Sequence, residues 1–201
     1  MEATRLKKDL VYVSHKVYQK GFTQGTGGNI SVRVPRSNTI LIKQTGKSLG
    51  EMTWEDALSV SLDGTVDEGF GKPSKELEFH LGIYRNRPET AAIIHCHPTY
   101  SIVMSQLCDT LPLPTITART ALGAVPVVPL APSGSPELAQ QVVAAFSGEN
   151  PPTVILMREH GLCAIGPSLE AAFNVVDLTE ATAKQAFLLG QGTANRARSE
   201  G

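Results

Sequence analysis

Two apolar runs in the C-terminal half of the chain are joined by only four residues. TVILM (153–157) and LCAIG (162–166) flank the segment REHG. A connection this short has no room for a crossover helix, so we expect the runs to pair as an antiparallel hairpin with a tight turn. NISVRV (29–34) and TILIK (39–43) repeat the arrangement around a PRSN turn. Consecutive strands without a helix between them predict a mostly antiparallel central sheet.

The segments around these strands have helical signals. Apolar residues repeat at helical spacing over residues 3–20, and Gly21 ends the pattern. Ser135 followed by Pro136 is typical of a helix N-terminus. Residues 109–133 are rich in proline and threonine, which predicts a loop with one short strand. Further helices are expected over residues 74–85 after a Ser74 cap, over 98–107, over 135–146 and from 168 onward.

These elements fit one α/β domain over residues 1–190, with helices flanking the sheet, followed by a disordered tail at 191–201. With 18 basic and 19 acidic residues, the chain has no overall field that attracts nucleic acid or an anionic membrane. The N-terminus lacks a signal-peptide core, and no run reaches the roughly 18 apolar residues of a membrane span. Three cysteines at irregular spacing argue against a disulfide framework. We therefore expect a cytoplasmic protein that binds neither nucleic acid nor membranes.

Two histidines lie one residue apart at the end of the apolar run AAIIHCH. Side chains at i and i+2 of a strand share a face, so His95 and His97 project together. A third histidine, His160, lies in the tight turn of the hairpin, and Glu76 lies near a helix start. Imidazole and carboxylate groups are ligands of catalytic zinc. Three neutral imidazoles and one carboxylate leave the metal with net positive charge, which suits a Lewis acid.

Other assignments of these residues stay open at this point. A single histidine is more often a hydrogen-bonded structural residue than a ligand, and distance along the chain does not show which side chains converge. His80 lies four residues after Glu76 on the same helical face, so a Glu76–His80 pair is a rival to the zinc site. Glu159, beside His160, is a second candidate for an acid or base.

Three loops are rich in glycine, hydroxyl groups or lysine: GTGGN (25–29), QTGKSLG (44–50) and KPSKE (72–76). Such loops expose successive backbone N–H groups to an anion, and Ser74 and Lys75 at a helix start add a dipole and a charge. Each loop can also be a simple turn. Together they favour a phosphorylated substrate, although none fits the P-loop or the dinucleotide-binding pattern.

Five segments of this chain resemble the class II aldolase family of L-fuculose-phosphate aldolase and ribulose-phosphate epimerase. They are, in order, GFTQGTGGNISVR, QTGKSLGEM, KPSKELEFHLGIYRNRP, AAIIHCHPTYS and REHGLCAIG, and the resemblance covers about residues 5–190. It implies a zinc ion on His95, His97 and His160. It also implies that Glu76 binds the metal in the absence of substrate and becomes the acid/base once substrate displaces it.

The same resemblance implies a substrate site and an assembly. It places the phosphate pocket at Asn29, Thr45, Gly46, Ser74 and Lys75, with Lys75 where the fuculose enzyme has a second serine. It also implies a three-layer α/β architecture and a homotetramer with active sites between subunits. The expected activity is a metal-dependent lyase that cleaves a carbon–carbon bond of a small sugar phosphate through a zinc-stabilised enediolate.

One segment departs from the aldolase pattern. The fuculose aldolase takes a proton-donating tyrosine from the neighbouring subunit, but residues 112–124 here, PLPTITARTALGA, contain none. The threonine, histidine and aspartate signature of the epimerase is missing from the same region. KPSKE, SLG and PELA are more similar to the branch that decarboxylates 3-oxo-tetronate 4-phosphates. That decarboxylation is the first alternative to aldol cleavage.

Two further alternatives belong to other functional classes. In the methylthioribulose-phosphate branch of the superfamily, zinc and a glutamate eliminate water, so product analysis separates a dehydratase from a lyase. Adducin head domains resemble the same fold as interaction modules without catalysis. Such relatives tend to lose the metal histidines, and this chain keeps all three.

Overall fold

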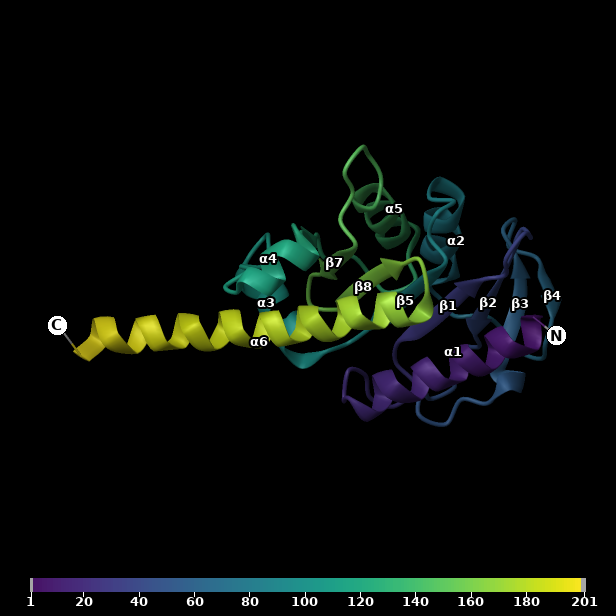
Figure 1. Ribbon diagram of the computed structural model, residues 1–201, viewed down its shortest axis with the longest axis horizontal. Helices are drawn as coiled ribbons and strands as arrows, with labels where there is room; N and C mark the ends of the chain where they lie inside the picture. The colour runs from purple at the N-terminus through teal and green to yellow at the C-terminus, as the bar shows by residue number, and fades with distance from the viewer. Residues whose placement is uncertain (1, 200–201) are drawn as a thin grey trace.

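An eight-stranded sheet forms the centre of the molecule (Figure 1). The computed structural model describes the backbone of residues 2–199 and the side chains of residues 3–191. The strands lie in the order β4-β3-β2-β1-β5-β8-β7-β6, and every neighbouring pair is antiparallel except β6 and β7. The expected α/β fold with a mostly antiparallel sheet is confirmed. The strands are β1 (Asn29–Arg33), β2 (Thr39–Lys43), β3 (Ala57–Ser61), β4 (Val66–Glu68), β5 (Ala92–Cys96), β6 (Val127–Val128), β7 (Val154–Met157) and β8 (Gly161–Gly166).

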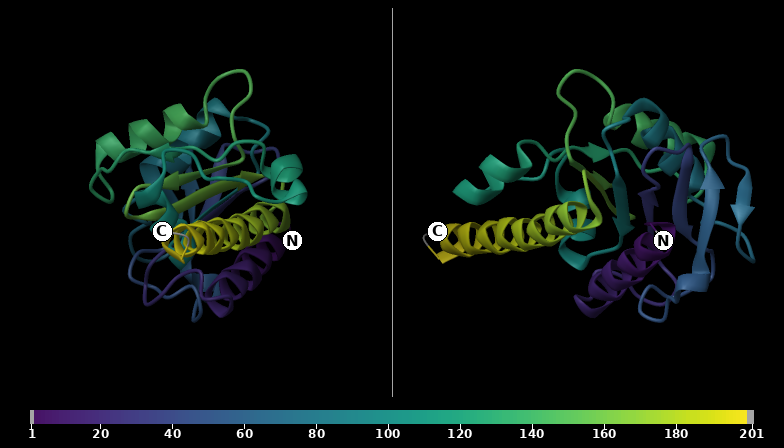
Figure 2. Two further views of the ribbon diagram at one scale, coloured as in Figure 1. Left: turned by 90° about the vertical axis from the view of Figure 1, so that its left-hand side faces the viewer. Right: turned by 45° about the vertical axis from the view of Figure 1, so that its right-hand side comes forward.

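Helices cover both faces of this sheet and give the molecule three layers (Figures 1 and 2). On one face, α1, α3, α4 and α6 bury side chains such as Val13, Met104 and Phe173. On the other face, α2 and α5 bury side chains such as Phe79 and Val142. The helices are α1 (Glu2–Gln19), α2 (Leu77–Asn86), α3 (Thr99–Leu107), α4 (Ile116–Leu122), α5 (Pro136–Ala145) and α6 (Leu169–Ser199), with a single 3₁₀ turn, η1, at Trp54–Asp56.

Strand β5 positions the first two histidines. It lies between β1 and β8, and all of its side chains are buried. Ile94 and Cys96 pack into the layer of α1 and α6, whereas Ile93 packs into the layer of α2 and α5. Because successive side chains of a strand alternate between faces, His95 shares the face of Ile93. It therefore faces the layer from which α2 brings Glu76.

The predicted loop at 109–133 contains a helix that the sequence reading missed. Helix α4 is capped by Thr115, whose side chain accepts a hydrogen bond from the backbone N–H of Ala118 at 3.1 Å. Ala118 and Leu122, four positions apart, are both buried in the core beside α6. The proline- and threonine-rich composition around this two-turn helix concealed its short apolar face. The expected strand in this region is confined to β6.

Two helix boundaries also differ from expectation. Helix α2 begins at Leu77 with Glu76 at its N-cap position, and Ser74 instead accepts a hydrogen bond from the N–H of Glu76 at 3.2 Å. Helix α6 continues through Ser199 and extends beyond the rest of the molecule (Figure 1), so most of the tail expected to be disordered is helical. Residues 200–201 lie outside the described part, and a domain end at 190 stays a prediction. In the described part of the chain, no helix is long and apolar enough to cross a membrane.

Candidate active site

Three histidines meet where β5 ends beside the β7–β8 hairpin. In the antiparallel register of β5 and β8, Cys96 pairs with Leu162, so His97, the residue after β5, lies against Gly161 and next to the turn residue His160. The ring centre of His95 lies 4.7 Å from that of His97 and 4.8 Å from that of His160. The possible ligand atoms of the three side chains all lie within 4.8 Å of one another. Strand pairing thus brings together histidines that are more than sixty positions apart in the sequence.

Two glycines allow this close approach. A Cβ atom at Gly161 would lie 2.2 Å from the carbonyl oxygen of Cys96 and 2.9 Å from the ring of His97. A Cβ atom at Gly27, in the GTGGN loop, would lie 2.8 Å from Nδ1 of His97. Any larger residue at either position would force the hairpin or the loop away from His97. The glycine of REHG is therefore required by packing against Cys96 and His97, whereas the positive φ of this turn falls at Glu159.

Glu76 lies directly against the histidine cluster. Its Oε2 lies 3.2 Å from Nε2 of His95, and its Oε1 lies 3.3 Å from Nε2 of His160. The carboxylate is 6% exposed. Asn29 donates a hydrogen bond to Oε2 and Ser133 donates one to Oε1, each at 2.8 Å. These two donors hold the carboxylate in one orientation between the two imidazoles.

The spacing of the donor atoms fits a tetrahedral divalent metal ion. Four ligands bound at about 2.0–2.1 Å lie about 3.3 Å from one another in a zinc site. Three distances between donor atoms are close to that spacing. Nε2 of His95 lies 3.0 Å from Nε2 of His97 and 3.2 Å from Oε2 of Glu76, and Oε1 of Glu76 lies 3.3 Å from Nε2 of His160. Nδ1 of His95 lies 2.8 Å from the carbonyl oxygen of Leu162, to which it donates a hydrogen bond, so Nε2 keeps its lone pair for a metal.

Burial sets the charge of these groups. It lowers the pKa of His97 to about 3 and that of His160 to about 4, and the charge of His95 acts in the same direction. Both imidazoles are therefore neutral near pH 7, in the form that binds metals. Burial alone raises the pKa of Glu76, but the charges of His95 and His160 and the hydrogen bonds to the carboxylate outweigh it and bring that pKa to about 2. Glu76 is therefore an anion beside the neutral His97 and His160.

A cavity of about 170 Å³ adjoins the histidine cluster. Its wall is built from the GTGGN loop, the QTG turn after β2 and the segment that leads into α2. The backbone N–H of Thr45 donates to the carbonyl of Lys72 at 2.9 Å, which ties the second of these segments to the third. The lining includes all five residues expected to bind phosphate: Asn29, Thr45, Gly46, Ser74 and Lys75.

Residues 8–187 match the class II aldolase and adducin N-terminal domain family. This chain belongs to that family. The match spans the histidine cluster, Glu76 and all three loops around the cavity. The expectation of a class II aldolase fold is confirmed, and the histidine triad is consistent with the divalent metal site typical of class II aldolases.

Relatives within the class II aldolase family carry two names. The 3-oxo-tetronate 4-phosphate decarboxylase of Pectobacterium atrosepticum is 36% identical over 193 residues, covering 92% of this chain and 85% of the relative. The L-fuculose phosphate aldolase of Methanococcus vannielii is 32% identical over 177 residues, covering 88% and 93%. The crystal structure of YgbL from Escherichia coli has a TM-score of 0.86 at 30% identity, covering 94% of this chain and 91% of that one. This chain is a carbon–carbon lyase of the class II aldolase or decarboxylase type.

Two cavity residues were missed by sequence reasoning. Ser133, which donates to Glu76, lies in the APSGS segment before α5, where only its small neighbours hinted at a close approach. Lys43 ends β2 with 2% exposure, and its ammonium donates to the carbonyl oxygens of Thr26, at 2.9 Å, and of Lys47. Burial lowers the pKa of Lys43 to about 8, although the charge of Glu76 acts in the opposite direction. The sequence did contain a signal for Lys43, because a lysine as the last residue of a buried strand is unusual.

Of two alternatives raised by the sequence, the Glu76–His80 pair is not formed, and Glu159 lies outside the lining of the cavity. The nitrogens of His80 contact Asn29 and Ser31 rather than Glu76, so the rival Glu76–His80 pair is absent among the described contacts. Glu159 is exposed, and its backbone N–H donates to Ser105 at 3.1 Å. Within the part of the chain that the structure describes, the one carboxylate that lines the cavity is that of Glu76.

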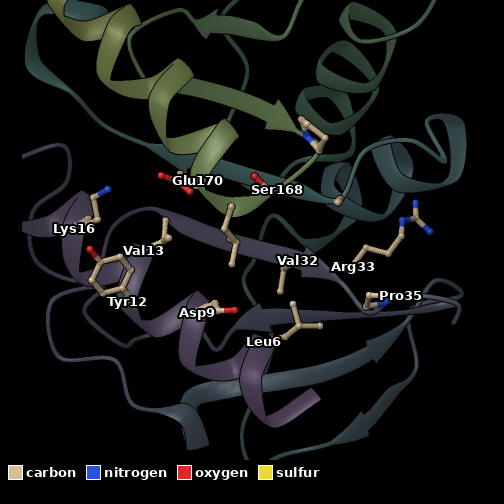
Figure 3. A pocket seen from close by; sticks show the side chains of 13 residues that line it. Leu6, Asp9, Tyr12, Val13, Lys16, Val32, Arg33, Pro35, Ser168 and Glu170 are labelled. Carbon is tan, nitrogen blue, oxygen red and sulfur yellow. The ribbon is translucent and has the colours of Figure 1, made fainter. Parts of the chain in front are cut away.

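A larger pocket, of about 510 Å³, lies elsewhere, between α1, the end of β1 and the start of α6 (Figure 3). Apolar side chains such as Leu6, Val13 and Val32 line it. Its Arg33 already donates to the carbonyl oxygens of Tyr84 and Thr90. None of the clustered histidines lines this pocket. The chemistry of the chain is therefore assigned to the smaller cavity.

Proposed function

We propose that this chain is a metal-dependent decarboxylase of a small phosphorylated oxo acid, such as a 3-oxo-tetronate 4-phosphate. In this proposal His95, His97 and His160 hold a divalent metal, with Glu76 as the fourth ligand and as the acid/base. A metal ion at this site would supply the positive charge that stabilises the enediolate left when the carbon–carbon bond breaks. Zinc fits the nitrogen and oxygen donors and their spacing.

The observation that carries this choice is the set of proton-transferring groups in the cavity. Among the described residues, Glu76 is the only carboxylate that lines it, and no tyrosine does. Aldol cleavage must take a proton from a substrate hydroxyl and add one to the carbon that loses its partner. Decarboxylation breaks the C1–C2 bond, releases CO₂, moves the electron pair onto C2 and the C3 carbonyl, and adds one proton to C2. Decarboxylation therefore consumes one proton, which the ionised Glu76 would take up from solvent and pass to C2, so one acid/base is enough for this second reaction.

The phosphate is proposed to bind at the loops that line the cavity. The backbone N–H groups of the glycine-rich loop and the QTG turn, with the hydroxyl groups of Thr45 and Ser74, are anion donors. Lys43 and Lys75 line the same cavity and can add positive charge. Binding a remote phosphate provides energy that orients the reacting carbons.

Aldol cleavage of a ketose 1-phosphate is the second candidate. It is supported by the aldolase relative, which matches almost as well as the decarboxylase and over nearly its whole length. The homotetramer with active sites between subunits, which the resemblance to the aldolase family implies, also belongs to the proposal, and in it a partner subunit would supply a further proton donor. The cytoplasmic location also stays a prediction. Neither relative named above is a dehydratase or a binding module.

A substrate panel distinguishes these reactions. The zinc-loaded protein is given 3-oxo-tetronate 4-phosphates and ketose 1-phosphates, and CO₂, aldehyde and loss of water are each measured. We expect CO₂ from the oxo-tetronate phosphate and about one zinc per chain, with most of the zinc lost in His95→Ala, His97→Ala and His160→Ala. Aldehyde from a ketose phosphate without CO₂ would select the aldolase, and full zinc content in a variant would remove that histidine from the site.

A further inference from the structure

A chain of hydrogen bonds runs from Glu76 into the interior between β1 and α2. Asn29 Nδ2 lies 2.8 Å from Glu76 Oε2, and Asn29 Oδ1 contacts Nε2 of His80. Nδ1 of His80 lies 2.7 Å from Ser31 Oγ, which lies 2.9 Å from the hydroxyl of Tyr84. All five side chains are more than nine-tenths buried. Water therefore has little access to replace a lost partner.

The direction of every bond in this chain follows from the carboxylate at its end. Glu76 is an anion and can only accept, so the Asn29 amide must donate to it. The carbonyl oxygen of Asn29 then faces His80, which must donate from Nε2. A neutral His80 has its lone pair on Nδ1, so Ser31 donates there and accepts in turn from Tyr84. Each donor thus points toward Glu76.

The charge states of the two titratable members agree with this direction. Burial lowers the pKa of His80 to about 3, and the charge of His95 adds to that effect. Burial also raises the pKa of Tyr84 well above its ordinary value. His80 is therefore neutral and Tyr84 keeps its proton at ordinary pH. A neutral imidazole with a fixed donor on Nδ1 has one tautomer available to it.

The spacing of these residues shows how the arrangement is built. Asn29 and Ser31 are two positions apart on β1 and therefore share a face. His80 and Tyr84 are four positions apart on α2 and therefore share a side of the helix. The first turn of α2 is also preceded by Glu76 itself. Packing α2 on β1 thus completes all four contacts at once.

We propose that His80 is a positioning residue whose Nε2–H tautomer, which leaves Nδ1 to accept from Ser31, keeps the Asn29 amide turned with its donor toward Glu76. With the other tautomer, Nε2 would accept, and the amide would turn its carbonyl oxygen toward the carboxylate. The repulsion between these two oxygens would move Glu76 away from His95 and His160. The effect of this displacement on metal binding rests on the proposed function, whereas the assignment of the His80 tautomer is independent of it.

The first test is spectroscopic and uses the wild-type protein. Long-range ¹H–¹⁵N spectra of histidine-labelled protein distinguish protonation at Nε2 from protonation at Nδ1, with and without zinc. We expect His80 to be neutral and protonated at Nε2 in both samples. Protonation at Nδ1 would overturn the proposal. A protein that gives this result but turns over no sugar phosphate would contradict the proposed function alone.

The second test compares two replacements of His80 by zinc affinity, measured by competition with a chelator. Gln at this position has an N–H to donate to Asn29 and an oxygen to accept from Ser31, whereas Leu has neither. We expect His80→Leu to weaken zinc binding by about tenfold or more, the usual effect of removing a partner of a metal ligand, and His80→Gln to restore most of it. Equal affinity in the two variants would overturn the proposal.

A matched variant controls for loss of a buried hydroxyl. Ser31→Ala removes the donor to Nδ1 of His80, and we expect a changed His80 spectrum and weaker zinc binding. Ser14 is also fully buried, and its hydroxyl contacts the carbonyl of Leu10 at 2.8 Å and the sulfur of Met52 at 3.3 Å, outside this chain of bonds. Ser14→Ala should change neither the His80 spectrum nor the zinc affinity. The same response in both alanine variants would show a general packing effect and overturn the specific role.

Discussion

Glu180 on α6 accepts two hydrogen bonds from Ser101, one from its backbone N–H and one from its hydroxyl, each at 2.8 Å. The other oxygen of the carboxylate accepts from the N–H of Tyr100, also at 2.8 Å. These are N–H groups of the first turn of α3, and the N-cap residue of that helix, Pro98, offers no side-chain acceptor. The long last helix thus caps the helix that starts directly after His97.

This contact predicts a specific loss of stability. Glu180→Ala leaves two helix N–H groups and a hydroxyl without their acceptor, so we expect the free energy of unfolding to fall by about 1–2 kcal/mol, as measured by urea denaturation. Thr115→Ala is the matched control, because it removes the cap of α4, which carries no candidate metal ligand. Both variants should lose stability, but only Glu180→Ala should also weaken zinc binding. Unchanged stability in Glu180→Ala would contradict the capping role.

Glu76 is predicted to be essential for turnover. Glu76→Gln keeps the shape of the side chain but cannot take up a proton as a carboxylate, and its amide N–H₂ would face one of the two donors, Asn29 or Ser133. We expect the turnover number to fall by about 10² or more, with a smaller effect on zinc content. Glu159→Gln, on an exposed side chain beside His160, is the control and should retain activity. The reverse result would move the acid/base to Glu159.

The periodicities of the sequence predicted what depends on local pattern. Alternation placed His95 and His97 on one face, and the four-residue turn of the hairpin predicted that His160 would lie at a rigid tip. The helix α4 was missed because its buried face consists mainly of Ala118 and Leu122, too short a pattern to stand out among prolines. Long helices and hairpins can be predicted from local spacing. A two-turn helix such as α4 cannot, because its stability comes from packing on α6.

The contacts between distant segments could not be predicted from spacing. His80 and Glu76 have ideal helical separation, yet Glu76 is the N-cap residue and turns toward His95 while His80 turns toward β1. Ser133 reaches Glu76 from a loop that is 57 positions away. Such contacts depend on how α2 and the loop before α5 pack on the sheet, which no single segment encodes.

Lys43 is predicted to make stability depend on pH. Its pKa falls from the ordinary value of 10.5 to about 8 in the folded chain, mainly through burial. Between these two values the unfolded state binds more protons than the folded state, so the stability contributed by this residue rises with pH across that window. Below the lower value the cost of burying the charge is fully present. Urea denaturation measures the free energy of unfolding of the wild type and of Lys43→Met. We expect the difference between the two to change with pH across this window. A constant difference would contradict the lowered pKa of Lys43.

Lys75 is predicted to recognise the phosphate of the substrate. It is exposed at the wall of the cavity and directly precedes Glu76. The resemblance to the fuculose aldolase implies a serine, with a neutral hydroxyl, at the position of Lys75. A charge at this position can make a charge-assisted contact with a phosphate bound in the cavity. We therefore expect Lys75→Met to raise KM for the phosphorylated substrate much more than for its dephosphorylated analogue, with little change in the free energy of unfolding.

Lys72→Met, on an exposed lysine of the same loop that does not line the cavity, should affect both substrates equally. An equal response of both substrates to Lys75→Met would place this side chain in solvent and weaken the case for the decarboxylase, since that branch was favoured in part by the KPSKE segment.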